Sequence, residues 1–258
     1  MVDIKLNGVK NIRDLGGIVV KGGKLKRHKL LRSPCLDKLT QKDMDILVNE
    51  YKLSTIIDLR TDREVIERKD LEMKNVKYIH MPIFNERVPG ITHEKQENAN
   101  RDSEINMMKM YQGILSGEYL EKVKEIIKKI IHMQDDEYSV LFHCTAGKDR
   151  TGIIAAILLL ILGADKQTVI DDYLYTNKVN KKNATKIYWK IKIFERNQKK
   201  AENIRNVFLA KPEYIDTVFK VIDEDWNGID NFITNGLNIT KEEIERFREK
   251  MIDKLVVS

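Results

Sequence analysis

The run His143-Cys144-Thr145-Ala146-Gly147-Lys148-Asp149-Arg150-Thr151-Gly152 predicts a loop that closes around one tetrahedral dianion. Five residues separate its cysteine from its arginine, so the backbone N–H groups of the loop can point inward. Residues 139–142 before the loop read Ser-Val-Leu-Phe and predict a short buried strand. Residues 152–162 have no polar face and predict a buried helix, whose positive N-terminus would meet the same anion. Strand, loop and helix together are the context that such an anion site requires.

Cys144 and Arg150 have the chemistry of a phosphate-transferring pair. A free thiol titrates near pH ~8.5, but converging amides, a helix N-terminus and a guanidinium are expected to hold Cys144 as a thiolate. A thiolate can take a phosphoryl group as a covalent thiophosphate. The planar fork of Arg150 can hold two phosphoryl oxygens into the transition state. The alternative, a structural cysteine followed by a chance arginine, would need agreement at about six positions, roughly one chance in a million per chain.

The other loop residues have expected roles as well. Gly147 allows a close backbone approach or a positive φ, where a side chain would block the phosphate oxygens. The Thr151 hydroxyl is expected to hydrogen-bond the sulfur, and His143 is expected to orient the loop without touching substrate. The predicted phosphate-binding residues are Thr145, Ala146, Gly147, Lys148, Asp149 and Arg150.

Elsewhere the chain alternates strand and helix patterns. Apolar runs at 55–59 and 76–81 predict strands, and glycines in 16–24 predict a turn-rich hairpin or loop. Thr40, Thr61 and Thr240 each stand where an N-cap would begin a helix. Alternating strands and helices predict a parallel sheet covered on both faces, with ligand bound at the carboxyl ends of the strands.

The loop, in the form HCxAGKDRTG, resembles the signature of cysteine-dependent protein tyrosine phosphatases, and in particular of the bacterial tyrosine/lipid phosphatases with members in mycobacteria and Listeria. The resemblance extends along essentially the whole chain. It includes Asn11-Ile12-Arg13-Asp14-Leu15-Gly16-Gly17, Leu31-Arg32-Ser33, Ile56-Ile57-Asp58-Leu59-Arg60 with Arg63-Glu64, Asp171-Asp172-Tyr173-Leu174 and Lys211-Pro212-Glu213-Tyr214.

This resemblance implies an α/β fold of the tyrosine phosphatase type, with a central mostly parallel sheet flanked by helices. It implies one domain over residues 1–258, acting on phosphotyrosine proteins or peptides through a cysteinyl phosphate. Phosphoserine, phosphothreonine and phosphoinositides remain open as further substrates. A silent module that reads phosphorylated partners without turnover is the alternative, and the intact Cys144, Asp149 and Arg150 argue against it. No cofactor is expected. His28, His80, His93 and His132 show no metal-ligand spacing, so no metal is expected either.

The general acid is open between two regions. Residues 82–104 contain several acids but no recognisable acid-loop motif. Asp149 lies inside the loop, and in the family that this chain resembles an aspartate at that position is implicated as the acid. We favour Asp149 over the alternative that it only supports the loop, because positioning comes before any pKa argument.

Several further residues have two readings. Lys148 either adds charge for a second phosphate or a polyanionic head group, or points to solvent. Asp58 and Arg60 end a neighbouring strand, where Arg60 either contacts substrate or forms a structural ion pair. Asn11, Arg13 and Asp14 are expected to tie the N-terminus to the core. Cys35 is expected to be a small half-buried residue and not a redox partner of Cys144.

Residues 178–200 form a strongly basic segment, with nine lysines and arginines against one acid, Glu195. A basic amphipathic helix of this kind can lie on an anionic membrane or steer anionic substrates. The resemblance suggests a helical lid or insertion around 178–210, and an ordinary solvated helix is the alternative. Nucleic-acid binding is not expected, because no recognised binding module accompanies the charge.

The start of the sequence shows no apolar run of signal-peptide length, and the longest apolar run, 153–162, is too short to span a membrane. Two cysteines in 258 residues indicate a reducing compartment, so a cytoplasmic location is expected. The oligomeric state is open, with a monomer as the simplest expectation.

Overall fold

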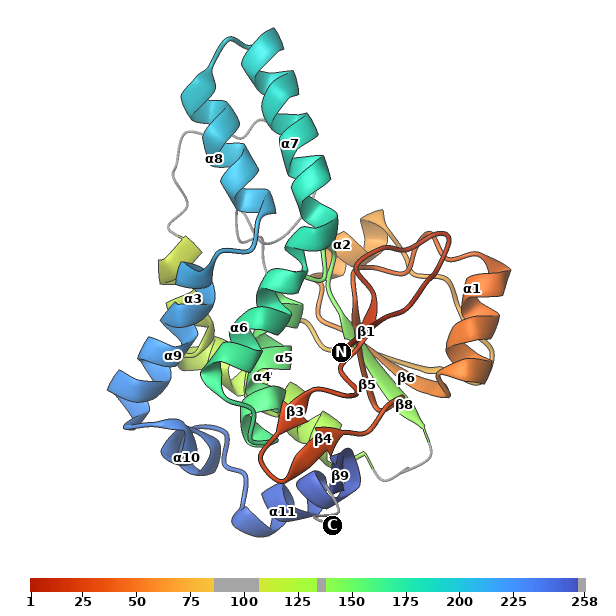
Figure 1. Cartoon of the computed structure of the whole chain (residues 1–258), viewed down its shortest axis with the longest axis vertical. Helices are drawn as coiled ribbons and strands as arrows, with labels where there is room; N and C mark the ends of the chain where they lie inside the picture. Colours follow the sequence, from red (N-terminus) through yellow and green to blue (C-terminus); the bar gives the residue numbers. More distant parts are fainter. Residues whose placement is uncertain (86–106, 134–137, 255–258) are drawn as a thin grey trace.

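The computed structural model describes residues 1–85, 107–133 and 138–254. The polar insertion expected from about residue 85 to residue 103 falls almost wholly outside these residues. The described chain forms an α/β structure with a central sheet flanked by helices, which confirms the predicted fold class (Figure 1).

The central sheet has six strands, and the loop of interest follows one of its middle strands. In spatial order they are β1 (Val2–Asp3), β2 (Arg13–Asp14), β5 (Leu30–Ser33), β8 (Ser139–His143), β6 (Leu53–Asp58) and β7 (Lys77–His80). Strands β5, β8, β6 and β7 are parallel, and β1 and β2 add to one edge in antiparallel fashion. Ser33, His143, Asp58 and His80 are aligned in register, so the ends of four strands meet at one edge of the sheet.

Side chains along each strand point alternately to the two faces of the sheet, and both faces are covered by an apolar cluster. On β8, Val140 and Phe142 belong to one apolar cluster and Leu141 to another. The larger cluster contains α5 (Asp149–Ile161), every residue of which is buried. Helix α5 is apolar around its whole circumference because it is packed inside this cluster. The helices that complete this layer are α3 (Met107–Ile114), α4 (Gly117–Ile131), α6 (Lys166–Tyr175) and α9 (Pro212–Trp226).

The opposite face is covered by the helical segment after Thr40, which consists of α1 (Gln41–Asp45) and a π-helical stretch, Ile46–Glu50. Thr40, Thr61 and Thr240 are each the predicted N-cap, and each forms a capping box, at the starts of α1, α2 (Asp62–Glu67) and α11 (Lys241–Met251). A capping box satisfies two backbone N–H groups that a helix start would otherwise leave unpaired.

The hairpin expected in residues 16–24 is also present. Its strands β3 (Val19–Val20) and β4 (Gly23–Leu25) pair with each other, and β4 also pairs with β9 (Ile252–Lys254), which brings the C-terminal part of the chain against the N-terminal part. Between α9 and α11 lie α10 (Ile229–Asn231) and a π-helical turn, Phe232–Gly236.

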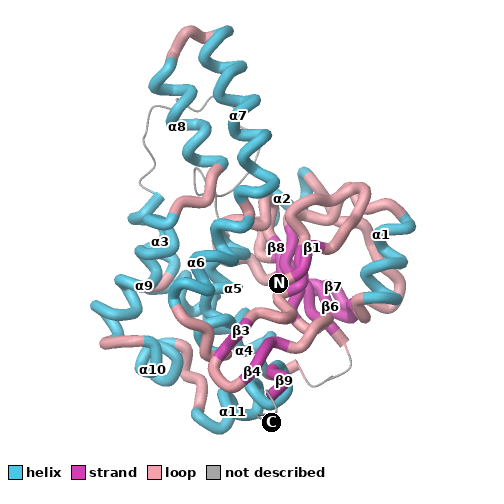
Figure 2. Tube along the Cα trace, viewed as in Figure 1, coloured by secondary structure: helices cyan, strands magenta, loops and turns pink. Residues whose placement is uncertain are grey.

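The basic segment forms a pair of helices that stands out from the rest of the molecule. Helices α7 (Asn177–Phe194) and α8 (Gln198–Phe208) run side by side and project beyond the layer of α3, α6 and α9 (Figures 1 and 2). The base of the pair is fixed by Asn177, whose side chain exchanges two hydrogen bonds with the backbone of Ala210, at 2.7 and 2.9 Å. Within the described residues, no helix has the length and apolar character needed to cross a bilayer.

Candidate active site

The loop predicted from the sequence lies at the carboxyl edge of the sheet. Cys144 directly follows β8 and α5 begins at Asp149, so five residues, 144–148, separate strand from helix. Cys144 is buried, with 2% of its surface exposed. Gly147 has a φ of +65°, and a Cβ on it would lie 2.6 Å from the carbonyl oxygen of Ser33. Glycine is therefore required here both by backbone conformation and by space.

Arg150 is held by a carboxylate that the sequence analysis did not select. Its Nη1 and Nη2 donate to the two carboxylate oxygens of Glu64, at 2.6 and 2.8 Å. Thr145 in the loop donates its hydroxyl hydrogen to Glu64 at 2.6 Å. All three side chains are buried. A paired arrangement of this kind fixes the plane of the guanidinium before any substrate arrives.

The electrostatics of this pair keep the guanidinium charged. Burial acts to lower the pKa of Arg150, but Glu64 and Cys144 outweigh it and raise that pKa. Glu64 is also the third residue of α2, where its carboxylate accepts the backbone N–H of Thr61 at 3.0 Å. One carboxylate thus caps a helix and orients the arginine.

Residues of the N-terminal segment form hydrogen bonds to the phosphate loop and behind it. Asn11 donates to the carbonyl oxygen of Ala146 at 3.3 Å, and its own side-chain oxygen accepts from Arg13 at 2.9 Å. Arg13 also donates to Asp172 on α6, at 3.0 Å. The structure therefore brings Asn11 and Arg13 to the site, one against the loop and the other behind it. Asp14 instead accepts the backbone N–H groups of Gly16 and His28, and so supports the turn beside β2.

Arg32 is another buried arginine that contacts both the loop and Asp172. Arg32, at the end of β5, donates to the carbonyl oxygen of Gly147 at 3.0 Å and forms an ion pair with Asp172. Burial and the charge of Arg13 lower the pKa of Arg32 to about 10, so it remains protonated at neutral pH. Burial raises the pKa of Asp172, but the two arginines outweigh it and the net shift is downward. Asp172 is thus the shared anion between two guanidinium groups.

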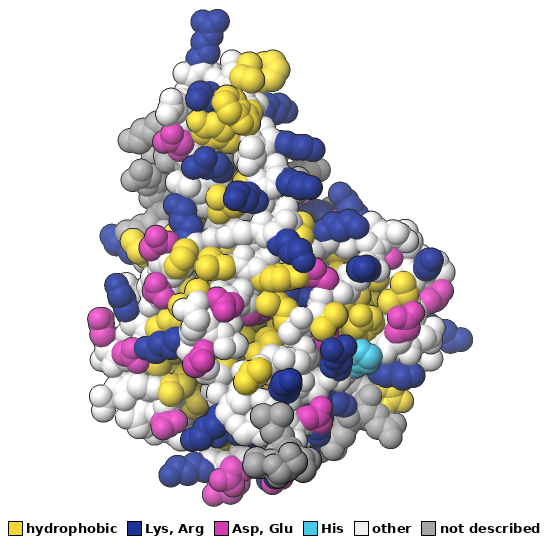
Figure 3. Space-filling model, viewed as in Figure 1, with side chains coloured by type: hydrophobic (Ala, Val, Ile, Leu, Met, Phe, Trp, Pro, Cys, Tyr) yellow, Lys and Arg dark blue, Asp and Glu magenta, His cyan; other side chains and the backbone are white. Residues whose placement is uncertain are grey.

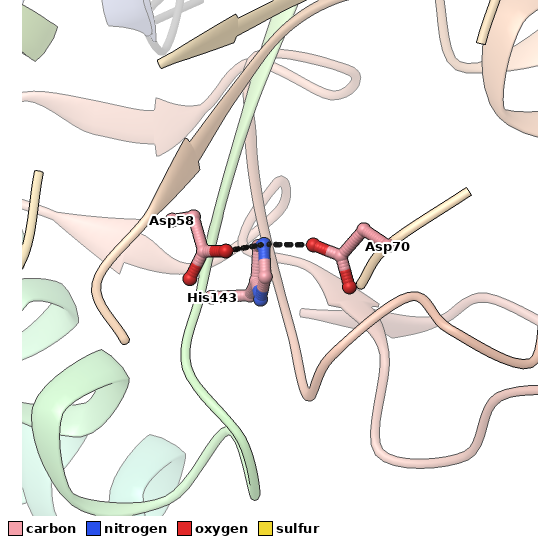
Figure 4. A group of neighbouring side chains, drawn as sticks. All are labelled: Asp58, Asp70 and His143. Carbon is pink, nitrogen blue, oxygen red and sulfur yellow. Dashed lines mark ion pairs between the residues drawn. The ribbon is translucent and has the colours of Figure 1, made fainter. Parts of the chain in front are cut away.

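Asp58, Asp70 and His143 form a buried cluster behind the loop (Figure 4). His143 Nε2 lies 2.9 Å from Asp70 Oδ2 and 3.8 Å from Asp58 Oδ2, and its Nδ1 lies 3.2 Å from the carbonyl oxygen of Cys144. Burial acts to lower the pKa of His143, but Asp58 and Asp70 outweigh it and raise that pKa. The imidazole therefore connects the strand ends to the backbone of the nucleophile.

Arg60 belongs to the same cluster and is fully buried. It donates to both carboxylate oxygens of Asp58 and lies 2.9 Å from Asp70. Its position favours the structural ion pair over contact with substrate. The carboxylates and the imidazole have ligand atoms within 4.8 Å of one another, as a metal would require. However, a guanidinium already contacts both carboxylates and neutralises part of their charge, so the cluster is explained as an ion-pair network.

Asp149 and Lys148 lie side by side at the start of α5, and both are buried. Asp149 Oδ1 accepts the hydroxyl hydrogen of Tyr111 at 2.6 Å, and Asp149 Oδ2 lies 3.4 Å from Lys148 Nζ. Lys148 Nζ also lies 3.5 Å from the carbonyl oxygen of Leu209, at the end of α8. Lys148 therefore does not point freely to solvent.

The Thr151 hydroxyl and the Cys35 thiol differ from the expectations of the sequence analysis. The Thr151 hydroxyl is buried and, among the described residues, has no hydrogen-bond partner, so the expected bond to the sulfur is not formed in this structure. Cys35 is buried, not half-buried, and donates its thiol hydrogen to Asp37 at 3.1 Å. Burial raises the pKa of Cys35 to about 12, so this thiol stays protonated and unreactive at neutral pH.

Sequence reasoning missed several residues that complete the site: Arg32, Glu64, Tyr111, Asp172 and Tyr173. Arg32, Glu64, Asp172 and Tyr173 were within the stretches that carried the family resemblance, which was a usable signal. Tyr111 had no signal, because its partner is 38 residues away and belongs to another helix.

A buried cysteine and arginine at one strand-to-helix junction, at the carboxyl edge of a parallel sheet, define a cysteine-based phosphatase. The comparison with known families agrees. The chain belongs to the tyrosine phosphatase family, whose model matches residues 4–253.

Individual relatives come from several bacteria. The chain is 24% identical over 250 residues to a predicted tyrosine-protein phosphatase of Cupriavidus necator, covering 92% of this chain and 85% of that protein. It is 22% identical over 276 residues to the triple specificity protein phosphatase PtpB of Mycobacterium tuberculosis, covering 95% and 97%. It is 32% identical over 143 residues to a tyrosine-protein phosphatase of Nostoc commune, covering 55% and 46%.

Proposed function

We propose that this phosphatase hydrolyses phosphotyrosine in proteins or peptides, with Cys144 as the nucleophile and Arg150 as the phosphoryl ligand. The observation that carries the proposal is the two-point contact between Arg150 and Glu64 beside the buried Cys144. The loop itself is hydrogen-bonded to Asn11, Arg32 and Glu64. In this proposal the backbone N–H groups of residues 145–150 hold the phosphoryl oxygens. In this proposal His143, Asp58, Arg60, Asn11 and Arg13 support the loop and do not touch substrate.

The proposed reaction has two steps. The Cys144 thiolate attacks phosphorus, the P–O bond to the tyrosyl oxygen breaks, and Asp149 gives its proton to the departing oxygen. Water then attacks the thiophosphate, Asp149 takes one proton from that water, and inorganic phosphate leaves as the thiolate is restored. Arg150 contacts the phosphoryl oxygens in both steps, where charge is greatest.

The experiment that tests this proposal is turnover of a phosphotyrosine peptide and of p-nitrophenyl phosphate by wild type and Cys144→Ser. We expect the variant to lose turnover and still bind vanadate, because a serine hydroxyl is a far weaker nucleophile in an unchanged loop. A rate within about tenfold of wild type would contradict covalent catalysis, since that factor is only ~1.4 kcal/mol of barrier. Absence of turnover in the wild type, with vanadate binding intact, would support the silent phosphate-binding module.

A second candidate function is hydrolysis of phosphoinositides at an anionic membrane, and the projecting helix pair supports it. Near its tip, Trp189, Ile193 and Phe194 are 51%, 64% and 79% exposed. Figure 3 shows hydrophobic side chains among lysine and arginine side chains on this projecting part of the molecule. Aromatic and aliphatic groups set among basic residues are typical of surfaces that lie in the interface of anionic bilayers.

This second function is tested by neutralising Lys186, Lys190 and Lys192 to glutamine. Each basic residue near an anionic surface is worth about 1 kcal/mol, so binding to phosphoinositide vesicles should fall by roughly a hundredfold. Activity on p-nitrophenyl phosphate should barely change, because that substrate needs only the loop. The control neutralises Lys38, Lys220 and Lys241, which are exposed on other parts of the molecule. Unchanged vesicle binding, or equal losses with the control, would identify α7 as an ordinary solvated helix.

We also propose that residues 1–258 act as one domain, with residues 178–210 as a lid or insertion beside the loop. Contact between Lys148 and Leu209 supports this, because it connects the phosphate loop to the end of α8. The cytoplasmic location expected from the sequence stays a prediction, as does the absence of a cofactor.

A further inference from the structure

Two buried tyrosines extend from Asp149 into the helical layer. The hydroxyl of Tyr111 donates to Asp149 Oδ1 at 2.6 Å, and the hydroxyls of Tyr111 and Tyr173 lie 2.7 Å apart. Tyr111 belongs to α3, Tyr173 to α6 and Asp149 to α5, so the chain of hydroxyls joins three helices. Tyr111 and Tyr173 are 0% and 1% exposed.

The hydrogens in this chain have one consistent arrangement. A phenol has one hydrogen to donate, and the hydrogen of Tyr111 goes to the carboxylate. The oxygen of Tyr111 is then the acceptor for the hydrogen of Tyr173. Burial and the nearby Asp149 charge raise the pKa of both phenols, so both remain donors at neutral pH.

This arrangement distinguishes the two oxygens of Asp149. Oδ1 accepts from Tyr111 at 2.6 Å, whereas Oδ2 lies 3.4 Å from Lys148 Nζ, so Oδ2 has the weaker contact and is the oxygen that more easily carries a proton. The other charged or titratable groups near the carboxyl are Arg150 on the same helix turn and Tyr214 on α9. Tyr214 packs its ring 5.8 Å from that of Tyr111 and, among the described residues, makes no hydrogen bond to Asp149.

We propose that Tyr111, oriented by Tyr173, is the positioning residue that fixes the Asp149 carboxyl so that Oδ2 delivers the proton to the leaving group. This inference rests on the proposed role of Asp149 as general acid. The two hydroxyls act through Asp149 and do not touch the substrate. They restrict rotation of the carboxyl and stabilise its ionised form after the proton has left.

The test compares Tyr111→Phe, Tyr173→Phe and the matched control Tyr214→Phe on a phosphotyrosine peptide and on an aryl phosphate with a low-pKa leaving group. Tyr111→Phe should lower kcat on the peptide by about tenfold, the loss expected for one hydrogen bond to a charged group. Its kcat on the activated ester should fall by less than about twofold, because that leaving group needs no proton. Tyr173→Phe should give a smaller loss of the same kind, and Tyr214→Phe should leave both rates unchanged.

The pH profile provides a readout that a merely structural role would not move. If Tyr111 acts on the proton transfer, the alkaline limb of kcat on the peptide should move in Tyr111→Phe and stay in place in Tyr214→Phe, because only the first variant removes a donor to the Asp149 carboxyl.

The double variant Tyr111→Phe, Asp149→Asn separates the possible outcomes. It should be no slower on the peptide than Asp149→Asn alone, because Tyr111 acts only through that carboxyl. If Asp149→Asn slows the peptide selectively but Tyr111→Phe does not, the positioning role is wrong and the acid assignment stands. If Asp149→Asn slows both substrates equally, the acid lies elsewhere and the proposed function fails at that step. Equal losses on both substrates in Tyr111→Phe, with a lower melting temperature, would identify a purely structural tyrosine.

Discussion

At the scale of the residue, Asp149 combines burial with a polar surrounding. A carboxyl group that is 2% exposed usually needs a specific reason to be there, because burying an ionised acid without partners is costly. Here one oxygen accepts from Tyr111 and the other lies near Lys148. Both carboxylate oxygens therefore lie near a donor group, which offsets the cost of burying this side chain.

Replacement of Asp149 by asparagine tests the acid directly. Removing a general acid typically costs about 10²- to 10⁴-fold when the leaving group needs a proton. The loss should be large on a phosphotyrosine peptide and much smaller on an activated aryl phosphate, measured as kcat on each. Equal losses on the two substrates would move the acid elsewhere, with residues 85–104 to be searched next.

At the scale of the element, the first turn of α2 has two functions. Glu64 closes the capping box with Thr61, and it also holds Arg150 by two hydrogen bonds. The start of this helix is thus coupled to the position of the phosphate ligand, although the two residues are 86 positions apart. A change in the helix start should appear in catalysis as well as in stability.

Glu64→Gln should reveal this coupling. The amide keeps one oxygen acceptor but loses the charge, which leaves a buried guanidinium incompletely paired. Truncating or neutralising one partner of a buried charge pair costs about 2–5 kcal/mol, so kcat/KM should fall by at least about tenfold and the melting temperature should also fall. Asp62→Asn is the matched control, because Asp62 lies in the same turn but its side chain is 83% exposed. Loss of activity in both variants would point to the helix terminus and not to Arg150.

At the scale of the whole molecule, the cluster behind the loop connects stability to pH. Asp58 and Asp70 raise the pKa of His143 against the effect of burial, so the folded protein binds that proton more tightly than the unfolded chain. The resulting stabilisation is fully present below the unfolded pKa of about 6.5 and is lost as pH rises through the folded pKa. Asp58 has the opposite sign. Burial raises the pKa of Asp58, but His143 and Arg60 outweigh it, so its contribution is lost as pH falls into the acid range.

Urea unfolding between pH 5.5 and 9 checks this prediction. The free energy of unfolding of wild type minus that of His143→Asn should decrease as pH rises above about 6.5. The wild type and the variant are compared as a difference because burial lowers the pKa of the Met1 amine in both. That group makes the free energy of unfolding rise with pH, opposite to the effect of His143, and the subtraction removes it. His132→Asn, which changes an exposed histidine, is the control. A difference that stays constant with pH would show that the charge of His143 does not contribute to stability.

Local patterns in the sequence were sufficient for the loop and for the strand and helices around it. The capping boxes at Thr40 and Thr61, the buried strand before Cys144 and the buried helix after it all depend on neighbours in the chain. The partners of the site could not be predicted in the same way. Tyr111 meets Asp149, and Glu64 meets Arg150, only because separate helices pack together. The π-helical stretch Ile46–Glu50 also depends on packing, since local spacing predicted an ordinary helix there.

The hydrogen bonds that hold the phosphate loop should make the enzyme sensitive to inhibition by its own product. Asn11, Arg32 and Glu64 hold the loop and its arginine by hydrogen bonds within the protein, so little ordering is needed when an anion binds. Such a cradle recognises a tetrahedral oxyanion and not the group attached to it. Free inorganic phosphate, the product, should therefore be a competitive inhibitor. The rate of turnover should fall as the phosphate concentration rises. Discrimination among phosphorylated molecules must then come from surfaces outside the loop.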